Sequence, residues 1–146
     1  ALCTSFKVEL LEGDHDFNNG ADAFKVALFK ANASITGTYG AATTNYSDVT
    51  GNSDELPNGS GYTTGGYTLT NVNPTSGGTT AFTDFSANAQ WTSATFTTRG
   101  CIIYNTSDGN SAVAMINFGA DYSVSGGTFE IQWPTADSSN AIIRIA

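Results

Sequence analysis

The chain is built from short runs of β-branched and aromatic residues, separated by glycine, asparagine, aspartate and proline, and this feature restricts its fold most. Within the runs, apolar and polar residues alternate, which is the period of a half-buried β-strand, and helical periodicity is hard to find. In residues 5–11, for example, Phe6, Val8 and Leu10 would share one face of a strand. We therefore expect an all-β fold.

We expect about eight strands, each bounded by turn residues. They cover residues 5–11, 24–30, 61–72, 79–86, 94–105, 111–120, 128–134 and 140–146. Without a helical layer, this pattern predicts one antiparallel β-sandwich domain over residues 1–146, with either jelly-roll or immunoglobulin-like connections. Residues 31–59 are polar and small, so we expect one long loop there, with a short helical turn near residues 53–57.

Details of the pattern predict particular strand geometry. In residues 94–105 the apolar side chains change parity near Arg99, and a β-bulge at Gly100 would account for this shift. The Asp-Gly pair at residues 108–109 predicts a tight hairpin between its flanking strands. Residues 111–120 are apolar on both parities, as in a central strand covered on both faces. In the strand after it, the expected inward-facing side chains are Phe129, Ile131 and Trp133.

The charge of the chain excludes some partners. Thirteen acidic residues oppose five scattered basic ones, which gives a net charge of −8. A phosphate backbone or an anionic membrane surface would be repelled, and no apolar run reaches the ~18 residues of a transmembrane helix. Cys3 and Cys101 lack metal-ligand spacing, and Cys101 is either a buried free thiol or, if the two ends of the chain lie close together, bonded to Cys3.

Residues 13–22, "GDHDFNNGAD", carry oxygen-bearing side chains at alternate positions, as a calcium loop does. An EF-hand is excluded, because Lys25 stands where the closing carboxylate should be. We expect a connecting turn, in which Asp and Asn bond to their own backbone and His15 is solvated. The weaker alternative is a surface calcium site, whose ligands would be Asp14, Asp16 and Asn18.

No catalytic constellation can be named from the sequence, which contains no nucleophile elbow, zinc-protease motif or phosphate-binding glycine loop. We therefore expect no enzyme activity and no cofactor. The tyrosines in and beside the long loop could stack on sugars, anchor a protein interface or cap the core, and the adjacent carboxylates suggest a solvated patch. The candidate partner-binding residues are Tyr39, Tyr46, Asp54, Glu55, Tyr62 and Tyr67.

Segments along nearly the whole chain resemble those of small virion structural proteins of tailed bacteriophages. The segments that carry the resemblance, in order, are "SFKVELLEG", "FKVALF", "SGYTTGGYTLT", "TTAFTDF", "WTSATFTTRGCIIYN", "AVAMINFG" and "PTADSSNAIIRIA". The resemblance implies a capsid decoration, or cement, protein that is made in the cytoplasm of a bacterial host and binds the outside of the assembled head. It also implies the major capsid protein as partner and a homo-oligomer, with a trimer favoured, and it carries over no catalytic residue.

Two other functions remain as alternatives. A carbohydrate-binding adhesin, or a module of a tail fibre or head fibre, would use the loop tyrosines as sugar-stacking residues. A small hydrolase would depend on His15 and Asp14, but no nucleophile can be assigned to it.

Overall fold

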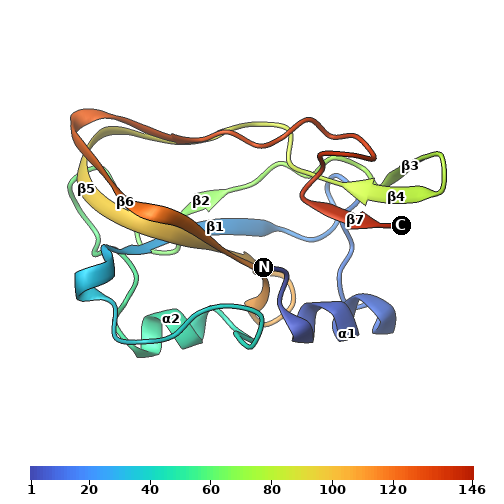
Figure 1. Ribbon diagram of the computed structural model, residues 1–146, viewed down its shortest axis with the longest axis horizontal. Coiled ribbons are helices and arrows are strands. Elements are labelled where there is room, and N and C mark those ends of the chain that lie inside the picture. Colours follow the sequence, from blue (N-terminus) through green and yellow to red (C-terminus); the bar gives the residue numbers. More distant parts are fainter.

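The structure, a computed structural model, describes residues 1–146 and is mostly β, with antiparallel sheets of four and three strands and few short helices (Figure 1). The larger sheet has the strand order β2-β1-β5-β6, and the smaller has the order β3-β4-β7. The strands are β1 (Phe24–Lys30), β2 (Tyr67–Thr68), β3 (Thr75–Gly77), β4 (Thr80–Thr83), β5 (Ala89–Asn105), β6 (Ser111–Ile131) and β7 (Ile143–Ile145). The helices are α1 (Thr4–Glu12), the 3₁₀ helix η1 (Asn32–Ser34) and α2 (Ser47–Gly51).

The long hairpin of β5 and β6 dominates the larger sheet, and its strands turn back together at one end of the molecule (Figure 1). Separate strands at residues 111–120 and 128–134 were expected, and this prediction is wrong because β6 continues from the first range into the second and ends at Ile131. Thr98 pairs with Tyr122 and Gly100 with Asn117, so Arg99 of β5 lies opposite residues 118–121 of β6. This interruption of the pairing lets one strand turn where the sequence suggests a break.

The predicted bulge near Gly100 is confirmed. The register of β5 shifts between Thr98 and Gly100, both against β6 and against β1. A Cβ atom on Gly100 would lie 2.2 Å from the carbonyl oxygen of Ile116 and 2.3 Å from the ring of Phe29. Only glycine fits between these neighbours without displacing backbone.

The hairpin turn between β5 and β6 is also confirmed. Ser111 N–H donates to Asp108 O at 2.9 Å, and the two residues between them have positive φ angles, 53° for Gly109 and 65° for Asn110. Positive φ at both central positions is the backbone of a type I′ turn, whose twist matches that of paired strands.

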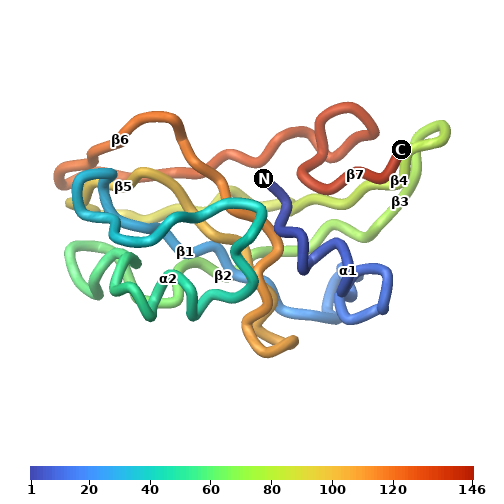
Figure 2. Tube along the Cα trace, turned by 60° about the horizontal axis from the view of Figure 1, so that its bottom comes forward, coloured from blue at the N-terminus to red at the C-terminus, as the bar shows by residue number.

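The apolar start of β6 is buried, although β6 is an edge strand and not the central strand that was expected. The N-terminal residues cover its edge: Cys3 N–H donates to Val113 O at 3.0 Å, and Met115 N–H donates to Ala1 O at 2.9 Å. Figure 2 shows these first residues running beside β6. A terminal segment thus takes the place of a neighbouring strand.

Residues 5–11 form helix α1, so the strand predicted there is wrong. The helix ends at Gly13, which adopts a left-handed φ of 89° and donates its N–H to Glu9 O at 3.0 Å. In this helix Phe6 is fully buried while Val8 and Leu11 are exposed. Leu, Lys and Glu favour a helix, and a C-terminal glycine stops it, so alternation over seven residues was misleading here.

Other boundaries differ from the expectations. The predicted loop at residues 31–59 contains η1 and α2, and the helical turn lies at residues 47–51 instead of 53–57. The strand at 61–72 shrinks to β2, because turns with positive φ at Gly65 and Gly66 precede it. The strand at 24–30 is confirmed as β1, and the remaining expected strands appear with changed bounds as β4, β5 and β7.

One cluster of 25 buried residues forms the core. Its largest fully buried apolar side chains are Phe6, Phe24, Val26, Leu28, Val49, Ile102, Ile103 and Val113. Cys3 and Cys101 are both buried and free, so no bond joins them. Burial raises the pKa of Cys3 to about 11 and that of Cys101 to about 12. None of the helices has the length and apolarity needed to cross a bilayer.

Candidate functional site

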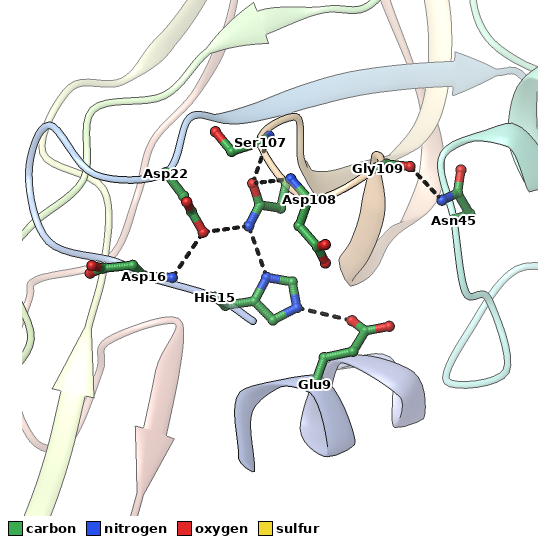
Figure 3. Close-up of polar contacts among 9 residues, drawn as sticks. Glu9, His15, Asp16, Asp22, Asn45, Ser107, Asp108 and Gly109 are labelled. Carbon is green, nitrogen blue, oxygen red and sulfur yellow. Dashed lines mark hydrogen bonds and ion pairs between the residues drawn. The ribbon is translucent and has the colours of Figure 1, made fainter. Parts of the chain in front are cut away.

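The expected solvation of His15 is wrong, because the structure buries it in a polar junction between α1, the connector at residues 13–22 and the β5–β6 turn (Figure 3). His15 as a whole is 7% exposed, and its side chain is fully covered. Its Nε2 lies 2.9 Å from Glu9 Oε2, and its Nδ1 lies 3.0 Å from Asn105 Nδ2. We call Glu9, His15, Asp22, Asn105 and Asp108 the His15 junction.

The amide of Asn105 fixes the tautomer of His15. Its oxygen accepts the Ser107 N–H at 2.9 Å, and its amino group donates to Asp22 Oδ2 at 2.8 Å. The amide therefore cannot be flipped without losing both bonds. The amino group then donates to Nδ1 of His15, so the ring carries its proton on Nε2 and donates it to Glu9.

Glu9, His15 and Asp108 offer ligand atoms that all lie within 4.8 Å of one another, as a metal centre would. A neutral histidine that binds a metal through Nε2 carries its proton on Nδ1 and usually donates it to an oxygen. Here Nδ1 faces the amino group of Asn105, so such a proton would point at another donor. The hydrogen bonds therefore favour a structural junction over a metal centre.

The three calcium candidates lie on the exposed side of the connector. Asp16 Oδ1 accepts the backbone N–H of Asn18 at 2.9 Å and its side-chain amino group at 2.7 Å. Asn18 thus turns a donor, and not its oxygen, toward Asp16. The backbone N–H of Asp14 donates to Glu9 O at 2.9 Å, at the C-terminal end of α1. These contacts are those of the expected turn, and calcium binding by Asp14, Asp16 and Asn18 stays an untested prediction.

Asp54 is buried, at 1% exposure, and serves as an acceptor for the loop that precedes it. Its carboxylate accepts the N–H groups of Thr36 at 2.9 Å and Gly37 at 2.7 Å, and the hydroxyl of Tyr39 at 2.5 Å. Burial alone would raise the pKa of Asp54, but these hydrogen bonds outweigh it and lower the pKa below its usual value. The ionised carboxylate therefore holds residues 36–39 against Asp54, whose backbone oxygen accepts the Lys30 N–H of β1 at 2.8 Å.

Glu55, next to Asp54, is also buried, and its carboxylate connects a second group of residues by hydrogen bonds. It accepts hydroxyls from Tyr46 at 2.5 Å and Tyr62 at 2.8 Å, and the Gly65 N–H at 2.7 Å. Tyr46 stacks on Tyr104, with ring centroids 4.3 Å apart. Burial and the nearby Glu55 carboxylate raise the pKa of both Tyr46 and Tyr62. Both tyrosines stay neutral donors, as the network requires.

The candidate partner-binding residues therefore fall into different environments. Tyr62, Asp54 and Glu55 lie inside the protein, while Tyr39 and Tyr46 are half-buried with their hydroxyls bonded internally. Only Tyr67 is half-buried with no hydrogen bond to its hydroxyl, and its ring packs edge-on against Trp91, with centroids 5.9 Å apart. The solvated acidic patch expected at residues 54–55 is wrong, since three or more donors satisfy each carboxylate.

An apolar groove of about 540 Å³ lies beside β6. Its walls come from the start of β6, the segment after β6 and the segment around residues 140–144. A smaller hollow continues from it and shares Phe118 and Ile131. The apolar side chains that line the groove include Leu2, Ile116, Phe118, Ile131, Trp133 and Ile142. We call this surface the β6 groove.

Sequence reasoning missed the β6 groove, although one signal pointed to part of it. Phe129, Ile131 and Trp133 were expected to face inward, and all three are half-buried against the core. The wall that includes Ile142 lies beside these residues only in the folded protein. No local sequence pattern could therefore have shown that the two walls face each other.

We also compared the chain with known proteins. No protein-family model, no curated protein and no solved structure matches it.

Proposed function

We propose that this protein is a non-enzymatic structural protein of tailed-bacteriophage virions, which binds the outer surface of the assembled capsid and stabilises it. The observation that carries the proposal is the β6 groove, an apolar surface that another protein chain, either a capsid subunit or a further copy of this protein, could cover. The sequence resemblance to small virion structural proteins points in the same direction.

The polar interior supports a binding role over a catalytic one. His15, Asp54 and Glu55 are the side chains most suited to acid–base chemistry, and each is engaged in internal hydrogen bonds. These bonds hold α1, the 31–59 segment and the β5–β6 turn against one another. Such fixed connections suit a module that has to remain folded while it reinforces a larger shell.

We also propose the type of β fold and the binding partners. We propose a single domain of the antiparallel β-sandwich kind, with jelly-roll or immunoglobulin-like connections. Its partners would be the major capsid protein and further copies of itself, with a trimer favoured, because several weak contacts add up through effective concentration. It would be made in the bacterial cytoplasm and reside on the capsid surface, and its charge of −8 disfavours nucleic acid and membranes.

The proposal is tested on phage heads that lack the protein. Purified protein is added to expanded heads, the heads are pelleted, and bound protein is measured together with the temperature at which the heads release DNA. We expect saturable binding and a higher release temperature. Heads that bind no protein, or that gain no stability from bound protein, would contradict the proposal.

The alternative, an adhesin or fibre module that binds carbohydrate through its loop tyrosines, has less support. The hydroxyls of Tyr39, Tyr46 and Tyr62 are hydrogen-bonded within the protein, which leaves Tyr67 as the freest of the four. Tyr67→Ala should therefore leave attachment to host cells unchanged if the capsid proposal is right. A large loss of glycan binding by Tyr67→Ala would favour the adhesin.

A further inference from the structure

Helix α1 presents an apolar surface that nothing in the chain covers. Val8 is 51% exposed and Leu11 is 89% exposed, and both count among the few large apolar side chains that are so accessible. They lie three residues apart, so they are neighbours on one face of the helix, whereas Phe6 packs inward. Together they form a small exposed apolar ridge, the α1 ridge.

We propose that the α1 ridge, Val8 and Leu11, docks into the β6 groove of a second copy of this chain. The ridge and the β6 groove are complementary in chemistry, since an apolar protrusion meets an apolar hollow. The groove volume of about 540 Å³ is large enough for several aliphatic side chains. Docking would remove both surfaces from water in one step.

Charge at the two surfaces supports a second copy as the occupant. The last turn of α1 contains no basic residue, and Glu12 forms no ion pair there. An acidic side chain at the C-terminal end of a helix is unfavourable, because that end already carries partial negative charge. Arg144 lines the β6 groove and is exposed; its guanidinium donates to the backbone oxygen of Ser139, but no carboxylate lies within ion-pair distance of it. Glu12 of one copy and Arg144 of the next would therefore attract each other.

The contact joins two different surfaces, so it is heterologous, and a heterologous contact closes into a ring when its rotation permits. The inference rests on the self-association included in the proposed function, and it assigns the β6 groove to a neighbouring copy and not to the capsid. It therefore concerns the purified protein alone.

The test is sedimentation velocity over a range of concentrations on wild type and on Leu11→Glu. Because Leu11 is almost fully exposed, Leu11→Glu should keep the fold, which far-UV circular dichroism and thermal unfolding check. We expect an oligomer for wild type and a dissociation constant raised about thirtyfold or more for Leu11→Glu. The matched control is Ile145→Glu, which places the same charge at another exposed apolar residue, outside the groove. It should associate like wild type.

A charge exchange gives a second readout that a folding defect would not reproduce. Glu12→Arg and Arg144→Glu should each weaken the association, and the double variant Glu12→Arg/Arg144→Glu should restore it. A wild type that is monomeric at all concentrations would overturn the self-association itself. An oligomer that Leu11→Glu leaves intact, or a double variant no better than the single ones, would overturn this surface while leaving capsid binding open to its own test.

Discussion

Replacing Asp54 by Asn tests whether the 31–59 segment is held by one buried carboxylate. In the wild type, this carboxylate accepts the N–H groups of Thr36 and Gly37 and the hydroxyl of Tyr39. Asn keeps one acceptor oxygen, but its amino group then faces N–H and O–H donors and cannot accept a hydrogen bond from them. A hydrogen bond to a charged group contributes about 1.5–3 kcal/mol, and an unpaired buried donor costs about 1–3 kcal/mol. We therefore expect Asp54→Asn to lower the free energy of unfolding at pH 7 by about 3 kcal/mol.

The free energy of unfolding lost in Asp54→Asn should also depend on pH. The direction of this dependence follows from the pKa of Asp54. The folded-state pKa lies below the usual value for aspartate, because hydrogen bonds to the carboxylate outweigh its burial. The stabilisation by ionised Asp54 is thus fully present above pH ~4 and is lost as the pH falls through the folded pKa. The difference between wild type and Asp54→Asn should therefore narrow below pH 4.

Asp84 offers a matched control within the same chain. It is as buried as Asp54, at 1% exposure, but accepts only the N–H groups of Phe85 at 2.8 Å and Ile142 at 3.1 Å. Burial outweighs these two bonds and raises its pKa. Ionised Asp84 therefore lowers stability at neutral pH, and wild type should gain stability relative to Asp84→Asn as the pH falls through the raised pKa. At pH 7, the loss of one hydrogen bond in Asp84→Asn is offset by removal of the buried charge, so stability should change by about 1 kcal/mol or less.

The assay is urea unfolding followed by tryptophan fluorescence, at several pH values between 7 and 3. The expected pattern is a large loss for Asp54→Asn that shrinks in acid, beside a small effect for Asp84→Asn with the opposite pH trend. A loss under about 1 kcal/mol for Asp54→Asn at pH 7, or equal pH trends for the two variants, would refute the reasoning.

Three other substitutions check the remaining structural arguments. Gly100→Ala should destabilise the protein by about 2–3 kcal/mol in urea unfolding, because its methyl group overlaps neighbouring backbone and an aromatic ring; an unchanged midpoint would contradict the bulge geometry. Asn105→Leu should cost about 3 kcal/mol by leaving His15 Nδ1 unpaired, whereas a neutral result would show that the His15 junction is not satisfied as described. Asp14→Asn and Asp16→Asn should each change stability by less than about 0.5 kcal/mol, and a melting temperature that rises with calcium in wild type alone would restore the calcium site.

The sequence predicted those elements whose local signals agree with one another. Apolar and polar residues alternate over residues 24–30, and β1 forms there as expected. The Asp-Gly turn was predictable because positive φ angles favour glycine and asparagine. The bulge was predictable from the change of apolar parity near Arg99, although the close neighbours that require glycine at position 100, Phe29 and Ile116, are distant in sequence.

The elements that were mispredicted depend on context beyond their own residues. Residues 5–11 alternate like a strand, yet the Gly13 cap and the lack of a pairing strand make them a helix. His15 and Asp54 looked solvated because their neighbours in sequence are polar, and they are buried because distant donors, from Asn105 and Tyr39, reach them. Contacts of this range are set by the fold and leave no local pattern.

The central claim is that this protein binds the outside of an assembled capsid. The most direct measurement is a cryo-electron microscopy map of the phage particle, compared with a map of particles that lack this protein. We expect density of this domain to appear on the outer head lattice, at repeated positions between capsid subunits, and to vanish in the deletion. Density confined to the tail, or two identical head maps, would contradict the proposal.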